Sequence, residues 1–369
     1  MYLIAILVTG FLLAYANGAN DNFKGVATLF GSGVTNRRRA LIWATVTTML
    51  GSLCAIWLAG ELLKSFSGKG IVPNELASDP RFAAAVALGA GLTVLLATRI
   101  GMPISTTHAL VGALTGTALV SAATIQWATL TGKFFVPLLL SPVIALAGTV
   151  MIYPLFRWIR ISLGLTKASC FCTGIEPIEV VPQMSSEMAV LRAETLSATL
   201  GTTVTCQEKY EGQLLGVNCA DALDKSHYFS AGLMSFARGL NDTPKIAALF
   251  LIAPEIGSFT ALALCGTAIA MGGLISSRRV AETMSHKITT MNAGQGFTAN
   301  LITAVTVISA SRWGLPVSTT HVSCGSLFGL GAVTGKAEWG GIAKILLAWV
   351  VTLPIAAALA ALTFHLIKG

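Results

Sequence analysis

The sequence predicts an all-α polytopic membrane protein made of two inverted-topology repeats, each with spanning helices and a broken, re-entrant helical hairpin. Three observations lead to this fold class. Of the 369 residues, 54% are hydrophobic and 11% are charged, which leaves too little polar surface to cover a water-soluble globule of this size. The apolar residues gather in long runs, and two polar motifs are each written twice inside those runs.

Ten apolar runs are long enough to cross or enter a bilayer. In order, they are Tyr2–Ala16, Ala40–Leu63, Phe82–Thr98, Ser105–Thr124, Phe134–Ile159, Tyr228–Ile252, Phe259–Ile275, Phe297–Ser309, Ser318–Val333 and Ile342–Ile367. A full span needs about 20 residues, so the pairs on either side of the two Pro-x-Ser-Thr-Thr sequences are short. Each of these pairs is expected to form a helical hairpin that dips into the membrane.

Composition divides the chain into a first membrane repeat at 1–166, a soluble cytoplasmic linker at 167–227 and a second membrane repeat at 228–369. The linker carries eight acidic and four basic residues and no long apolar run. Its segment Ser185–Leu200 is compatible with a short amphipathic helix. Its four cysteines are expected to be reduced structural thiols; a small metal site is the alternative, although the spacing matches no zinc motif well. They are Cys170, Cys172, Cys206 and Cys219.

Basic residues set the expected orientation. The formal charge of +8 comes largely from short runs between apolar segments, such as Arg37–Arg39 and Arg278–Arg279, and this pattern indicates cytoplasmic loops rather than a nucleic-acid surface. With these loops inside, both termini lie outside the cell membrane and the linker lies in the cytoplasm. The two halves then run in opposite directions through the bilayer, as in many secondary transporters.

Two polar motifs occur once in each half of the chain, at nearly the same separation. Asn20-Asp21 of the first half returns in the second as Asn241-Asp242. The stretch from Arg99 to His108 returns as Arg312 to His321, and both copies read Arg-x-Gly-x-Pro-x-Ser-Thr-Thr-His. Matched polar residues inside a membrane are typical of a transport pathway.

The Asn-Asp pairs predict a cation site. Asp21 and Asp242 are the two acids inside apolar segments, where an ionised carboxylate costs about 2.5–3.5 kcal/mol and needs a partner. Carboxylate and amide oxygens, with carbonyls freed where Gly18 or Gly239 loosens the helix, suit a small alkali cation. The alternative is an ion pair with the lysine three residues further on, Lys24 or Lys245, and the two interpretations do not exclude each other.

The Pro-Ser-Thr-Thr sequences predict an anion site. Pro103 and Pro316 break a helix, and the Ser or Thr that follows is suited to begin the next one, so unpaired N–H groups and hydroxyls point toward the membrane interior. Two such helix starts would surround a tetrahedral oxyanion with neutral donors. The alternative for a lone Ser-Thr run is helix packing, but the repetition favours binding. The candidate donors are Ser105, Thr106, Thr107, Ser318, Thr319 and Thr320.

Four further residues keep two interpretations each. Arg99 and Arg312 either attract the anion or snorkel and cap helix ends. His108 and His321 are either proton carriers or buried neutral side chains with one hydrogen bond, which is the commoner case.

These motifs, together with the stretch from Arg278 to Thr289, resemble the inorganic phosphate transporter (PiT) family. The resemblance covers both membrane repeats and leaves out the linker. It implies a sodium- or proton-coupled phosphate symporter, with the Ser-Thr-Thr hydroxyls as phosphate donors and Asn20, Asp21, Asn241 and Asp242 as coupling-ion ligands. Some members carry sulfate. The second motif continues Thr243-Pro244 where the first has Asn22-Phe23, so a sharper helix break is expected after the second aspartate.

The leading hypothesis is therefore a secondary active symporter that imports inorganic phosphate with a cation by alternating access. Sodium is favoured over a proton. No ATP-binding loop occurs, no cofactor is expected, and the chain is not expected to be an enzyme. Expected partners are phosphate, the cation and the lipid bilayer, with a homodimer as one expected assembly and no nucleic acid. Alternatives are a sulfate permease, a passive anion channel and an intramembrane aspartyl hydrolase, which needs its two carboxyls within about 3 Å.

Overall fold

The computed structural model describes residues 2–66, 70–180, 191–209 and 214–368. The chain forms two compact units. One contains residues 1–153 and 227–369, and therefore most of both predicted membrane repeats; the other contains residues 154–226. The second unit contains the end of the helix that precedes the predicted linker, since that helix continues to Ser162.

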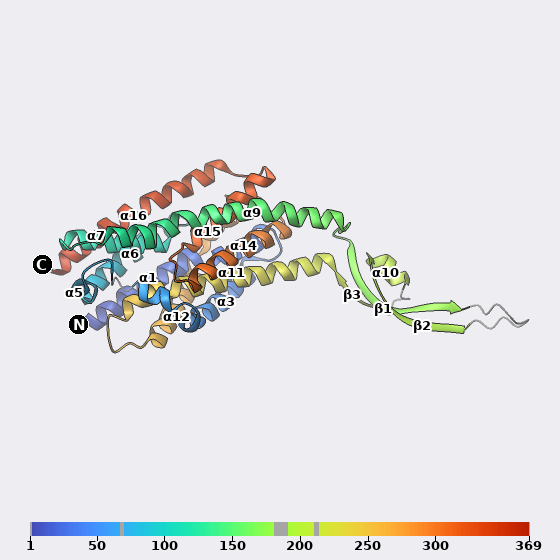
Figure 1. Cartoon of the computed structure of the whole chain (residues 1–369), viewed down its shortest axis with the longest axis horizontal. Coiled ribbons are helices and arrows are strands. Elements are labelled where there is room, and N and C mark those ends of the chain that lie inside the picture. Colours follow the sequence, from blue (N-terminus) through green and yellow to red (C-terminus); the bar gives the residue numbers. More distant parts are fainter. Residues whose placement is uncertain (1, 67–69, 181–190, 210–213, 369) are drawn as a thin grey trace, which may run out of the picture. The chain divides into compact units, whose positions relative to one another are not determined.

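The helices of the first repeat follow the predicted order of apolar runs (Figure 1). They are α1 (Tyr2–Asp21), the 3₁₀ turn η1 (Asn22–Val26), α2 (Ala27–Gly31), α3 (Arg37–Leu58), α4 (Gly60–Ser65), α5 (Asn74–Ala77), α6 (Pro80–Arg99), α7 (Thr106–Val120), α8 (Trp127–Leu130), the π-helical turn η2 (Thr131–Phe135) and α9 (Val136–Ser162).

The second repeat reproduces the principal helices of the first. It contains α11 (Cys219–Phe250), α12 (Ser258–Ser276), α13 (Arg278–His286), α14 (Ala293–Arg312), α15 (Thr319–Thr334) and α16 (Trp339–Lys368). The start of α12 follows that of α3 at the same separation as Asn241 follows Asn20. The starts of α14 and α15 follow those of α6 and α7 at the separation of Ser318 from Ser105, so the duplication extends to the helical framework.

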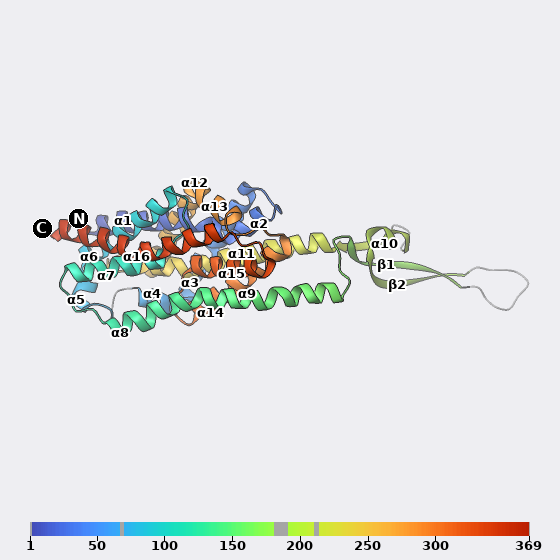
Figure 2. The same cartoon turned by 90° about the horizontal axis from the view of Figure 1, so that it is seen from above.

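Six helices of the described chain are long and apolar enough to cross a membrane, which confirms the predicted helical membrane protein. They are Tyr2–Gly31, Arg37–Leu58, Pro80–Arg99, Trp127–Ser162, Ser258–Ser276 and Trp339–Lys368. Helix α7 is apolar but shorter. Within the first unit, both termini lie at one end, and the chain leaves through α9 and returns through α11 at the opposite end (Figures 1 and 2).

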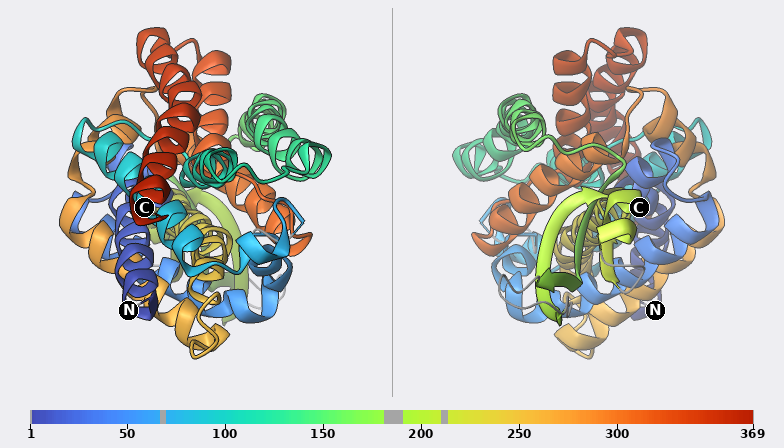
Figure 3. Two further views of the ribbon diagram at one scale, coloured as in Figure 1. Left: turned by 90° about the vertical axis from the view of Figure 1, so that its left-hand side faces the viewer. Right: turned by 90° about the vertical axis from the view of Figure 1, so that its right-hand side faces the viewer.

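The helices run side by side, as the end-on views show (Figure 3). Glycines at the two Asn-Asp motifs permit the closest contacts. A Cβ on Gly18 would lie 1.9 Å from the carbonyl oxygen of Ile269 in α12, and a Cβ on Gly239 would lie 2.1 Å from that of Thr48 in α3. These glycines therefore allow close helix packing, rather than the loosening expected from the sequence.

The predicted breaks are present between α6 and α7 and between α14 and α15. Each first helix ends at its arginine, and the following glycine adopts a positive φ of 75° at Gly101 and 69° at Gly314, which favours glycine. Ser105 and Ser318 then cap the next helix, since each side chain accepts a hydrogen bond from the backbone N–H of the following histidine, at 3.1 and 3.2 Å.

The expectation of a sharper break after the second aspartate is wrong. Helix α11 continues through Pro244 to Phe250, whereas the chain after Asp21 leaves the α-helix for the 3₁₀ turn η1. A proline inside a membrane helix is tolerated when neighbouring helices satisfy the freed backbone groups. The tighter turn after the first aspartate marks the less regular of the two copies.

The second unit carries an antiparallel sheet in the order β2-β1-β3, formed by β1 (Ser169–Val180), β2 (Leu191–Thr202) and β3 (Leu214–Asn218), with the short helix α10 (Thr203–Lys209). The expectation of a helix over Ser185–Leu200 is wrong for its last ten residues, which lie in strand β2. Residues 185–190 fall outside the described residues. A period-3.6 pattern in a short polar segment did not outweigh the strand pairing.

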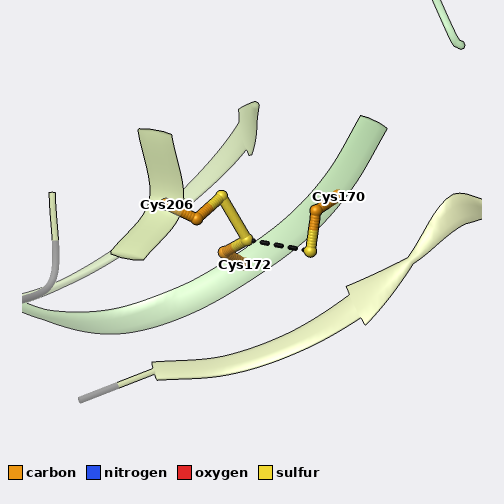
Figure 4. A group of neighbouring side chains, drawn as sticks. All are labelled: Cys170, Cys172 and Cys206. Atoms are coloured by element: carbon orange, nitrogen blue, oxygen red, sulfur yellow. Dashed lines mark hydrogen bonds between the residues drawn. A yellow bond between two sulfur atoms is a disulfide. The ribbon is translucent and has the colours of Figure 1, made fainter. Parts of the chain in front are cut away.

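Cysteines tie α10 to the sheet (Figure 4). Cys172 of β1 forms a disulfide with Cys206 of α10, so the expectation of reduced thiols is wrong for this pair. The Cys170 sulfur lies 3.1 Å from the Cys172 sulfur, and both Cys170 and Cys219 are free. Sequence spacing did not reveal this pair because the bond depends on a sheet that was not expected.

Candidate functional site

The two aspartates lie in one buried polar cluster with the starts of the two break helices. Thr106, the first residue of α7, donates to Asp21 at 3.1 Å, and Thr319, the first residue of α15, donates to Asp242 at 3.1 Å. The amide of Asn17 bridges the halves, since it lies 2.8 Å from an Asp21 oxygen and 3.5 Å from an Asp242 oxygen. The carboxylates and the helix starts therefore belong to a single site.

Both lysines pair with the aspartate of their own motif. The ammonium of Lys24 contacts Asp21, and that of Lys245 lies 3.5 Å from Asp242. All four side chains are buried, with at most 4% of each exposed. The ion pairs considered as an alternative are thus present in both copies.

The third residue of each triplet joins the two halves. The Thr320 hydroxyl accepts from Lys24 at 2.6 Å and donates to the Ile104 carbonyl at 2.8 Å. Correspondingly, the Thr107 hydroxyl accepts from Lys245 at 2.8 Å and lies 3.4 Å from the Val317 carbonyl. Each helix break therefore contacts the lysine of the other repeat's Asn-Asp motif as well as the other break.

The asparagines hold the breaks in place. The Asn20 amide donates to Thr98 and to the Met102 carbonyl at 2.9 and 3.0 Å, and its oxygen accepts from the Ile104 N–H at 3.1 Å. Asn241 donates to the Val317 carbonyl at 3.1 Å. Its oxygen accepts from Ser311, the counterpart of Thr98, at 3.2 Å. The amide oxygens predicted as cation ligands already accept hydrogen bonds from protein groups.

A fully buried arginine, Arg238, completes the cluster and was missed by the sequence analysis. Its guanidinium donates to the Asn17 and Asn22 side-chain oxygens at 3.1 and 3.0 Å and to the Thr48 hydroxyl at 3.1 Å. Arg238 holds the repeat position of Asn17, so it replaces a neutral residue of the first copy by a cation. An arginine inside an apolar run, at the matched position, was the available signal.

The described cluster carries a net positive charge. Three cations, Lys24, Lys245 and Arg238, face two carboxylates, Asp21 and Asp242, which gives +1 when all five are in their usual charged forms. The positive ends of α7 and α15 add to this charge. Such a site attracts an anion.

Nearly the whole chain matches the sequence model of a known family. The model of the phosphate transporter family matches residues 17–360, which is nearly the whole chain. The chain belongs to the phosphate transporter family. A relative from Pyrococcus abyssi that carries the name phosphate permease is 28% identical over 404 residues, covering 99% of this chain and 98% of the relative. A low-affinity inorganic phosphate transporter, by name, from Rhizobium meliloti is 27% identical, covering 98% and 95%.

A solved structure described as the sodium-dependent phosphate transporter shares the fold, with a TM-score of 0.77 at 22% identity over 100% of this chain and 99% of that chain. The chain is accordingly a transporter of the membrane and not an enzyme. The aspartyl hydrolase alternative is excluded on this ground.

Some residues that the sequence offered as candidates for the site lie outside the buried polar cluster of the two aspartates. Arg99 and Arg312 are exposed in the last turns of α6 and α14, which favours the helix-end interpretation over anion attraction. His108 and His321 are buried and face each other with ring centroids 4.3 Å apart, and His321 stacks on Trp349 at 3.7 Å. The two histidines thus pack where the helix starts of the two repeats meet.

Proposed function

We propose that this chain is a secondary active symporter that imports inorganic phosphate together with a monovalent cation by alternating access. One observation carries the proposal: the two Ser-Thr-Thr helix starts, one from each repeat, meet in a single buried cluster of net positive charge. Neutral N–H and hydroxyl donors at helix starts bind an oxyanion without holding it too tightly for release.

The donors of the site are the hydroxyls of both triplets, Ser105, Thr106, Thr107, Ser318, Thr319 and Thr320, with the first N–H groups of α7 and α15. In this conformation the four threonine hydroxyls contact protein groups of the cluster. Phosphate oxygens would replace carboxylate and carbonyl oxygens as their acceptors, so binding would loosen the contacts between the two breaks. Such an exchange links occupancy to a rearrangement of the repeats.

Asn20, Asp21, Asn241 and Asp242 are proposed to carry the coupling to the cation. Each aspartate accepts a hydrogen bond from a helix start, so a cation taken up beside it adds to the positive charge that an incoming anion meets. Cation and phosphate then raise each other's affinity by the same factor. A passive channel would not need two such acids.

Orientation is proposed from charge and from the path of the chain. The termini lie at one end of the helical unit and the two linker connections at the other, in agreement with outward termini and a cytoplasmic linker in a cell membrane. Inverted repeats, in which α3 and α12 run in opposite directions through the bilayer, follow from the same charge pattern.

The proposal is tested by uptake of radiolabelled phosphate into proteoliposomes that contain the purified chain. Imposed sodium and proton gradients are applied separately, with sulfate as the competitor that distinguishes a sulfate permease. Accumulation of phosphate above its outside concentration, lost when the driving gradient is collapsed, supports symport. Uptake that stops at equal concentrations under every gradient contradicts it.

A further inference from the structure

Each lysine of the site lies in a shell of oxygen atoms. Around the Lys24 ammonium stand a carboxylate oxygen of Asp21, the amide oxygen of Asn20 at 2.9 Å, the carbonyl oxygen of Ile104 at 3.0 Å and the hydroxyl of Thr320 at 2.6 Å. An ammonium has three N–H donors, so four surrounding oxygens exceed its donors. Carboxylate, amide, carbonyl and hydroxyl oxygens form the kind of shell that a hard alkali cation takes.

Three oxygens of corresponding kinds surround the ammonium of the second lysine. Val317 places its carbonyl oxygen 2.6 Å from the Lys245 ammonium, Thr107 its hydroxyl at 2.8 Å and Asp242 a carboxylate oxygen at 3.5 Å. These three residues stand at the repeat positions of the carbonyl, the hydroxyl and the carboxylate around Lys24, with the hydroxyl again supplied by the opposite repeat. We call these two shells the cation cages.

The charges of the cluster leave little room for a further cation. Both carboxylates already have an ammonium partner, and Arg238 brings the described cluster to a net charge of +1. Repulsion from an ammonium about 4 Å away, at an effective dielectric constant of about 20, lowers the binding affinity for sodium by a factor on the order of a thousand. A lysine side chain fixed in each cage therefore competes with sodium both for space and by charge.

We propose that Lys24 and Lys245 are tethered cations that occupy the two cation cages, and that phosphate uptake by this chain therefore does not use sodium. This inference rests on the proposed symport and concerns the ion selectivity of the same site. It differs from the sequence-based expectation of sodium, which held the ion pairs with Lys24 and Lys245 to be compatible with a bound alkali cation. The proton is the coupling ion that remains, because it needs no oxygen cage of its own.

Other charged and titratable groups surround the lysines. From α1 and α11 these are Asp21, Asp242 and Arg238, and from α15 they are the buried His321 and Cys324. The proposal depends on the position and charge of the two ammonium groups among these neighbours.

The first test uses the wild-type chain in proteoliposomes with an imposed proton gradient, with sodium or with choline as the external cation. We expect the initial rate of radiolabelled phosphate uptake to be the same in both media. A rate about tenfold or more higher in sodium, equivalent to about 1.4 kcal/mol of sodium-dependent driving or binding, overturns the proposal.

The second test opens one cage. Lys24→Ala leaves the oxygen shell around an empty space beside an unpaired Asp21, so sodium should bind there and raise the thermal unfolding midpoint of the purified variant relative to choline. Lys245→Ala should behave likewise. Lys133→Ala removes an exposed lysine from the turn η2 and is the matched control, for which, as for the wild type, no sodium shift is expected.

The outcomes separate the two levels of the proposal. Folded Lys24→Ala and Lys245→Ala variants without any sodium shift contradict the cages as cation sites. A wild-type midpoint that rises with sodium contradicts the tethered lysines, even if neither variant folds. Absence of phosphate uptake under every gradient defeats the symport instead, and leaves the sodium shifts to decide on the cages.

Discussion

Thr320→Val is the substitution that most directly probes the junction of the two helix breaks. The valine keeps the shape of the side chain and removes one hydroxyl, which accepts from Lys24 at 2.6 Å and donates to the Ile104 carbonyl at 2.8 Å. A hydrogen bond to a charged group is worth about 1.5–3 kcal/mol and a neutral one about 0.5–1.5 kcal/mol. The free energy of unfolding should therefore fall by about 2–4 kcal/mol.

Thr107→Val is the matched control, because the same change removes an equivalent bond from Lys245 at 2.8 Å but a second contact that is already 3.4 Å long. Its stability loss should be smaller. The assay is unfolding of both purified variants in mixed detergent micelles by increasing SDS, followed by tryptophan fluorescence and circular dichroism.

Phosphate uptake supplies the second readout for this pair. Both hydroxyls are proposed phosphate donors, so each variant should raise the KM for phosphate by about tenfold or more, the effect of one charge-assisted hydrogen bond. A Thr320→Val variant with wild-type stability and wild-type KM would refute the geometry of the junction.

Three further predictions concern the same framework. Arg238→Met leaves the buried oxygens of Asn17, Asn22 and Thr48 without their donor, at about 1–3 kcal/mol each, and should cost about 3 kcal/mol or more in SDS unfolding. A variant as stable as the wild type would show that Arg238 is not integrated in the cluster. Gly239→Ala places a Cβ 2.1 Å from the Thr48 carbonyl and should lower the free energy of unfolding by about 1–3 kcal/mol. In the control, Gly60→Ala, the added Cβ meets nothing within 4 Å, and no loss of stability is expected. Equal stability of the two variants would contradict the close packing of α11 on α3. Cys206→Ser opens a disulfide that joins residues 34 positions apart, and the chain-entropy model gives its stabilisation as about 4 kcal/mol. The linker unit of this variant should therefore be cleaved more readily in limited proteolysis, without a change in phosphate uptake. Cys219→Ser is the control, and equal cleavage of the two variants would speak against the disulfide.

The repeats made much of the membrane unit predictable. Because the Pro-Ser-Thr-Thr sequences combine a helix breaker with a helix cap, their positions predicted the starts of α7 and α15. The acids inside apolar runs were visible for the same reason, since a lone charge in a membrane needs a partner. The lysine partners of Asp21 and Asp242 followed from helical spacing alone.

Residues outside those rules were not found. Arg238 lies in an apolar run but outside the repeated Asn-Asp motif, so a search for matching residues overlooked a position where the copies differ in charge. Pro244 was read as a break, although tertiary packing keeps α11 continuous through it. The sheet of the linker depends on pairing between segments with little apolar periodicity, and such pairing is not visible in local patterns.

An experimental structure determined with phosphate bound tests the central claim most directly. We predict density for a tetrahedral anion between the starts of α7 and α15, with oxygens about 2.7–3.2 Å from hydroxyls or N–H groups of both Ser-Thr-Thr triplets. Phosphate held by residues of one repeat alone, or outside the cluster of Asp21 and Asp242, would contradict it.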